Sequence, residues 1–211
     1  MSITQRLGWG AMTFLSLAIA AYGLFHVASG FVHVPAEVAS NALFSPIGLH
    51  THIAASAIAL TLGPFQFLRS IRAKAPSIHR WSGRTYVAAC FVGGLAGGAI
   101  AMYSSSGPVA GAGFLCLAIL WLAFTGAALS AALRRDFITH ERWMVRSFAL
   151  TFAAVTLRLY LPIGVTLNHG EFVAPYTIIA WACWVPNLIL AEAWLAAQKG
   201  RVKPALQQTT R

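Results

Sequence analysis

Six long apolar stretches dominate this sequence, and they constrain its fold more than any other feature. Each has about 20 residues or more, the length that an α-helix needs to cross about 30 Å of hydrocarbon. Only 9% of the 211 residues are charged, against about 25% in soluble domains, so a soluble surface could not be covered. We therefore predict an all-α polytopic membrane protein, one integral membrane domain over residues 1–211, with spans at Leu7–Phe31, Ile47–Leu68, Thr85–Ser104, Ala110–Leu133, Ser147–Leu167 and Tyr176–Ala197. The first stretch is too long for a signal peptide, whose apolar region has about 7–15 residues, and is interpreted as a retained span.

Basic residues divide the connections between these spans into two kinds. Arg6 precedes the first span, and arginine and lysine are frequent in the second and fourth connections and after the last span. By contrast, Val32–Pro46, Ser105–Val109 and Asn168–Pro175 contain none. The positive-inside rule places the basic connections and both termini in the cytoplasm. We expect a multi-pass protein of the bacterial inner membrane. The net charge of +10 then reflects orientation and contact with anionic lipid headgroups, not nucleic acid.

The two central basic segments resemble each other. Residues 79–86 read HRWSGRTY and residues 140–148 read HERWMVRSF; with one insertion, both have His, Arg, Trp, two residues, Arg, a hydroxyl residue and an aromatic. We predict that they lie in cytoplasmic loops and that the second to fifth spans form a parallel internal repeat. Two interpretations stay open for their arginines, contact with lipid headgroups or an anion-binding site; the candidates are Arg80, Arg84, Arg142 and Arg146.

One arginine lies deep inside a predicted span. Arg158 follows Arg146 by 12 residues, about 18 Å along a helix, where an arginine costs roughly 2.5–3.5 kcal/mol on insertion scales. It shares a helix face with Ser147, Thr151 and Ala154, so this small, polar face should point inward. Its partner is expected to be an outer carboxylate, Glu37 or Glu171, or a bound ligand.

The second span carries a similar stripe through His52, Ser56, Gly63 and Gln66, whereas His50 points elsewhere. Gln66 joins the candidate ligand contacts. His26 should reach the same depth as His52, and such a pair could hold the iron of haem b between two helices. A lone membrane histidine more often packs or donates a hydrogen bond. The candidate haem ligands are His26, His52, His79 and His140, and no other metal site is expected.

The run from His140 to Arg158, together with His52, residues 63–66 (GPFQ) and residues 83–86 (GRTY), resembles the bacterial membrane proteins grouped as domain of unknown function 2306. The resemblance extends from His52 to Pro162. It implies a multi-span membrane protein and brings no established activity. The architecture is also similar to that of transmembrane b-type cytochromes, although no motif of theirs is present.

No nucleotide-binding or hydrolase motif occurs, and the connections are too short to hold a catalytic domain, so whether the chain is an enzyme stays open. Three functions remain. The first is a membrane redox protein that binds haem b and exchanges electrons with quinol. The second is a transporter or binding protein for a small anion or lipid, and the third is an accessory membrane subunit without its own ligand.

Overall fold

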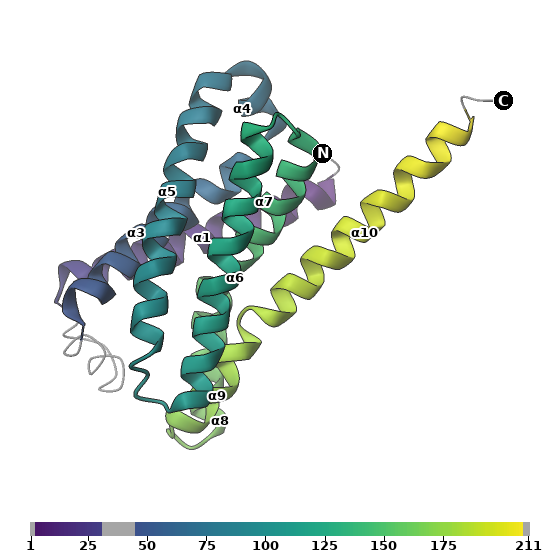
Figure 1. The fold of residues 1–211 in the computed structure, drawn as a ribbon. Coiled ribbons are helices and arrows are strands. Elements are labelled where there is room, and N and C mark those ends of the chain that lie inside the picture. The colour runs from purple at the N-terminus through teal and green to yellow at the C-terminus, as the bar shows by residue number, and fades with distance from the viewer. Residues whose placement is uncertain (1–2, 31–44, 209–211) are drawn as a thin grey trace.

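The structure is a computed structural model that describes residues 3–30 and 45–208, with only the backbone described over 199–208. All regular elements in these ranges are helices, which confirms the all-α class (Figure 1). They are α1 (Ile3–Ala28), α3 (Pro46–Gln66), α4 (Arg69–Lys74), α5 (Pro76–Ala101), α6 (Pro108–Leu133), α7 (Phe137–Thr151), α8 (Ala153–Leu167), α9 (Val173–Ala182) and α10 (Val185–Gln208).

Five helical segments of the described chain are long and apolar enough to cross a membrane: α1, α5, α6, the continuous path α7–α8, and α9 with the first part of α10. The sixth predicted span, α3, is absent from this set because His50 and His52 lower its mean hydropathy. Yet α3 lies inside the bundle, where it packs on α1 and α5, while α6 packs on α5 and α7. The chain is thus a multi-pass membrane protein, and the count of six and the orientation stay predictions.

The two basic repeat segments lie in helices and not in the predicted loops. Helix α5 begins at Pro76 and α7 at Phe137, so residues 79–86 and 140–148 are helical. Proline suits the first helical turn, where its missing N–H leaves no bond unmade. Asp136 caps α7 by accepting a hydrogen bond from the Thr139 amide at 3.1 Å. Hydropathy detects only the part of a helix that crosses hydrocarbon, so both helices begin several residues before the predicted spans.

The last two predicted spans are broken, which the sequence analysis did not expect. Helix α7 ends at Thr151 and α8 begins at Ala153; α9 ends at Ala182 and α10 begins at Val185. One side chain serves both breaks, because Asn187 Nδ2 donates to the carbonyl oxygens of Ala149 (3.3 Å) and Cys183 (3.0 Å). Backbone groups freed in a membrane helix need such partners, since lipid offers none.

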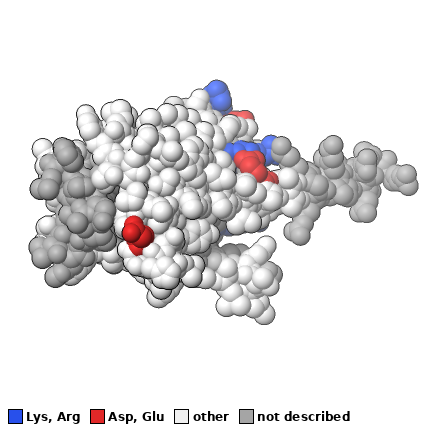
Figure 2. All heavy atoms as spheres, turned by 90° about the horizontal axis from the view of Figure 1, so that it is seen from below, with Lys and Arg blue, Asp and Glu red and all other residues white. Residues whose placement is uncertain are grey.

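The bundle has a basic end, formed by α4 and the first turns of α5 and α7, and an almost uncharged end. In Figure 1 the start of α1 and the end of α10 lie in the half that carries α4, and the α8–α9 turn lies at the opposite end. Seen from that opposite end in Figure 2, most of the described surface is white, with few basic side chains. This asymmetry agrees with the predicted orientation. Helix α10 leaves the bundle and extends away from it (Figure 1).

Candidate functional site

A cavity of about 270 Å³ lies in the interior of the bundle, and every predicted span contributes to its wall. Most of the wall is apolar, formed by aliphatic side chains, Phe114, and the glycines of α5. Apolar pockets with a few polar groups are typical of ligand sites. The polar and aromatic groups of the wall are Tyr22, His26, His52, Ser56, Ser104, Trp121, Thr151, Arg158, Tyr176 and Cys183.

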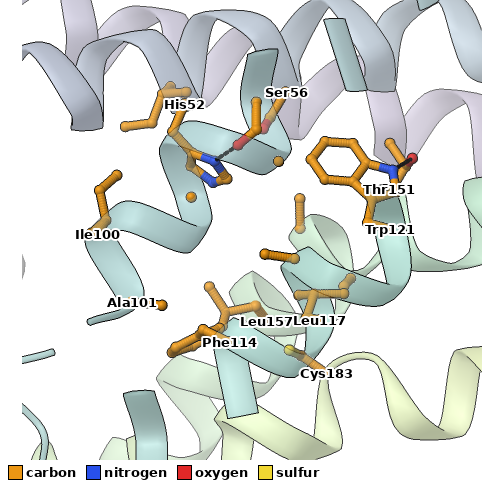
Figure 3. A pocket seen from close by; sticks show the side chains of 18 of the residues that line it. His52, Ser56, Ile100, Ala101, Phe114, Leu117, Trp121, Thr151, Leu157 and Cys183 are labelled. Atoms are coloured by element: carbon orange, nitrogen blue, oxygen red, sulfur yellow. Dashed lines mark hydrogen bonds between the residues drawn. The ribbon is translucent and has the colours of Figure 1, made fainter. Parts of the chain in front are cut away.

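His52 is fixed in the wall by its contacts with α5. Its Nδ1 lies 2.8 Å from the carbonyl oxygen of Gly93, and a carbonyl only accepts, so Nδ1 carries the hydrogen. The ring rests on Gly97, where a Cβ atom would lie 2.7 Å from Nδ1. Figure 3 shows the imidazole reaching from α3 into the cavity, opposite Phe114 and Leu157. The inward orientation predicted for His52 is confirmed, while His50 Nδ1 is bonded to the Pro46 carbonyl of its own helix at 2.6 Å.

Arg158 brings a charged group into the same wall. Its Nη1 donates to the carbonyl oxygen of Ala154 at 3.0 Å, one turn earlier in α8. Within residues 3–30 and 45–198, no carboxylate lies within ion-pair distance of it, because the ion pairs there are Arg72–Glu141 and Arg146–Glu192. Glu171 is therefore not its partner, and Glu37 lies outside the described residues. The guanidinium has five N–H groups, so donors remain available toward the cavity.

His26 reaches the cavity from α1, as predicted from its depth. It is only 5% exposed, and its ring packs edge-on against Tyr22 (4.4 Å between centroids) and Phe25 (5.6 Å). Three candidates from separate parts of the sequence, His26, His52 and Arg158, are thus brought to one cavity. Tyr22 and Tyr176 add two phenol groups to the same wall.

A buried hydrogen-bond network lies beside the cavity and joins α5, α6 and α7. The Thr151 hydroxyl contacts the Tyr86 hydroxyl at 2.9 Å and accepts from Trp121 Nε1 at 2.9 Å. The Ser147 hydroxyl contacts those of Tyr86 (3.1 Å) and Thr125 (2.7 Å). The inward face predicted for α7 is confirmed. Because these groups satisfy one another, the network holds the helices together on the side of the cavity nearer the basic end.

The other candidates lie at the basic end, away from the cavity. His79 lies 14 residues before Gly93 in α5, about 21 Å along the helix, and it interacts electrostatically with His140. His140 Nδ1 is bonded to the Ala128 carbonyl at 2.9 Å. Gln66 donates to the Ser82 hydroxyl at 2.8 Å, so it belongs to this end as well. The structure does not bring these residues together with His52 and Arg158.

The arginines of the basic end have partners on the protein surface. Arg84 and Arg146 lie over the rings of Trp81 and Trp143, at 5.0 and 4.7 Å from the ring centroids. Arg146 also forms a two-pronged ion pair with Glu192 of α10, with Nη2 2.8 Å from Oε2. Arg80 is exposed and Arg142 is partly buried. The contact of these arginines with lipid headgroups stays a prediction.

Sequence reasoning missed Trp121, Tyr176 and Asn187. A signal existed for Trp121, because an indole N–H at mid-span needs a buried acceptor. Pro186 was a sequence signal for the break in the last span, because proline has no backbone N–H to donate within a helix. Nothing in the sequence showed that Asn187 would serve both breaks.

Fold and site together define a multi-pass helical membrane protein with a mostly apolar cavity, in whose described wall one arginine lies. Residues 49–195 match the family described as "Predicted membrane protein (DUF2306)", and the chain belongs to this family. The match contains α5 to α9 and nearly all of α3, and it includes His52 and Arg158. Neither the curated proteins nor the solved structures contain a significant match to this chain.

Proposed function

We propose that this protein is a transporter or binding protein of the bacterial inner membrane for a small amphiphilic anion. The charged group of the anion binds Arg158. One observation carries the proposal: Arg158 lines an otherwise mostly apolar cavity, and the described residues supply no carboxylate for it. An ionisable side chain inside a membrane span is costly and is typically functional. An anionic ligand offsets that cost while it is bound.

The wall also indicates the shape of the ligand. Arg158 supplies a cationic donor group, whereas Leu117, Leu157 and Ile100 supply apolar surface. With a volume of about 270 Å³, the cavity is near the lower limit of ordinary ligand pockets. A carboxylate, sulfonate or phosphate group on a short alkyl or aryl body fits this combination. Each methylene buried in the apolar part should add about 0.8 kcal/mol to binding.

The experiment uses octanesulfonate, which is an anion at every accessible pH, and measures the ligand-induced rise in melting temperature of the purified protein in mild detergent. Binding to the folded state raises the melting temperature with ligand concentration. We expect a rise for wild type that shrinks for hexanesulfonate, is lost in Arg158→Gln and is partly kept in Arg158→Lys. Octanol, which has the tail without the charge, should give no comparable rise.

Two matched variants separate a ligand contact from a structural ion pair. If Arg158 pairs with a carboxylate of the protein, Glu37→Gln or Glu171→Gln should lower the melting temperature as much as Arg158→Gln does, without any added ligand. If Arg158 serves a ligand, both glutamate variants should respond to octanesulfonate like wild type. Equal responses of Arg158→Gln and wild type to octanesulfonate would refute the proposal.

Haem b, with His26 and His52 as ligands, stays a prediction. Their cavity of about 270 Å³ is smaller than a haem, so a haem would enter only if the helices moved apart. The test is an absorption spectrum of protein purified after haem supplementation, oxidised and dithionite-reduced. A spectrum without a Soret band would reject haem b.

A further inference from the structure

We infer that the cavity takes up its anion together with one proton, which His52 accepts at Nε2. The inference rests on the proposed anion site and adds the coupling of that site to pH. No other covalent change is involved: a proton leaves the aqueous phase and binds the Nε2 lone pair while the anion enters.

The geometry leaves only one ring nitrogen of His52 able to change its protonation. Nδ1 donates to the Gly93 carbonyl oxygen at 2.8 Å, so in the neutral ring Nε2 is the acceptor. The ring also lies close against Gly97 of α5. A proton therefore enters or leaves at Nε2 without disturbing the bond that fixes the ring.

Few other groups of the described wall can titrate. Helix α1 contributes His26 and Tyr22, α9 contributes Tyr176 with Cys183 directly after it, and α8 contributes Arg158. The lining residues of α5, α6 and α7 are glycine, serine, threonine, tryptophan and apolar side chains, and none of these titrates. Tyrosine and cysteine are neutral at physiological pH, so Arg158 supplies the charge of the described wall and the two histidines are the groups able to change it.

Charge balance links the proton to the anion. With Arg158 charged and His52 neutral, the empty described wall has a charge of +1; protonation of His52 would raise it to +2 inside an apolar cavity, where two like charges repel strongly. A bound monoanion cancels one charge, and protonation of His52 then returns the total to +1. The protonated Nε2 also gives the anion a second charged donor.

Linkage makes the effect reciprocal: an anion that favours the proton must itself bind more tightly at low pH, by the same factor. We expect the affinity for octanesulfonate to rise by up to about tenfold for each unit by which the pH is lowered, in the range where His52 titrates. Because this probe does not titrate, the pH dependence belongs to the protein.

The test is isothermal titration calorimetry of octanesulfonate in the presence of two buffers with different ionisation enthalpies, from pH 5.5 to 8. We expect wild type to take up close to one proton per anion bound at pH values between the titration of His52 in the empty protein and its titration in the complex. His52→Gln should still bind octanesulfonate, with a nearly pH-independent affinity and no proton uptake. His50→Gln is the matched control and should behave like wild type, whereas His26→Gln, which changes the other histidine of the wall, should keep the proton uptake.

The possible results of these titrations distinguish the proton-uptake inference from the proposed anion binding. Arg158-dependent binding without proton uptake in wild type, or proton uptake kept in His52→Gln, would overturn this inference and leave the proposed function intact. Proton uptake lost in His26→Gln would move the site to the other histidine. Absence of any Arg158-dependent binding would overturn both proposals. The proton count of wild type needs no variant, so the inference stays testable even if His52→Gln does not fold.

Discussion

Replacing Gly97 with alanine should displace the His52 ring and destabilise the protein. A Cβ atom at residue 97 would lie 2.7 Å from His52 Nδ1 and 2.8 Å from Cε1, which no ring can tolerate without moving. The imidazole must then give up its bond to the Gly93 carbonyl or push α3 away from α5. Loss of a buried hydrogen-bond partner costs about 1–3 kcal/mol, and overpacking costs typically 1–3 kcal/mol.

Part of this cost is offset, because alanine is better than glycine in a helix by about 1 kcal/mol. A net loss of about 2 kcal/mol is therefore expected, which corresponds to about 4–8 °C in melting temperature for a chain of this size. The assay is thermal unfolding in mild detergent, followed by tryptophan fluorescence.

The neighbouring glycine provides the control. A Cβ atom at Gly98 would lie 3.5 Å from the Ala118 Cβ, an ordinary contact, so Gly98→Ala should equal or slightly exceed wild type in stability. The double variant Gly97→Ala with His52→Ala should recover part of the loss, because the clashing ring is gone. If Gly97→Ala and Gly98→Ala melt within 1 °C of each other, the described contact between α3 and α5 is wrong.

Two further changes test the helix ends. Asn187→Leu should lower the melting temperature by several degrees, because it removes the contacts of the amide group with the Ala149 and Cys183 carbonyls and with the Thr156 hydroxyl (2.9 Å); Thr156→Val, which removes only the contact with the hydroxyl, should cost less. Hydrogen bonds from the Thr139 hydroxyl and amide lower the pKa of Asp136. Its stabilising effect should therefore be present above its ordinary pKa and be lost as pH falls through the lowered value. A melting-temperature profile of Asp136→Asn should accordingly fall less from pH 6 to pH 3 than that of wild type, since the asparagine cap does not titrate; parallel profiles would contradict this cap.

The sequence determined the class of this protein and much of its inner face. The low charge content and the long apolar stretches required a membrane, because such a chain cannot cover itself in water. Helical periodicity sufficed to turn His52, Ser147, Thr151 and Arg158 inward, because side chains three or four residues apart share a face. The positions of the spans along the chain were also approximately predictable.

Helix ends and breaks were not predictable to the same degree. Residues 79–86 and 140–148 are helical because Pro76 and Asp136 begin their helices. Hydropathy does not detect these helix starts. The break after Thr151 has no local signal that we recognised. It persists because Asn187, from a distant segment, satisfies the Ala149 carbonyl.

Only the tertiary structure decided which candidates belong together. Sequence analysis placed six basic or amide candidates and four histidines at two depths, but depth alone does not show which faces meet. Packing of α3 on α5 and α1, and of α1 on α8, brings His26, His52 and Arg158 to one cavity. The glycines of α5 let α3 and α6 approach closely. The same packing leaves His79, His140 and Gln66 at the basic end. Nor could the sequence show that His52 donates to a backbone carbonyl 41 residues away, the contact that leaves its Nε2 as the acceptor of the neutral ring.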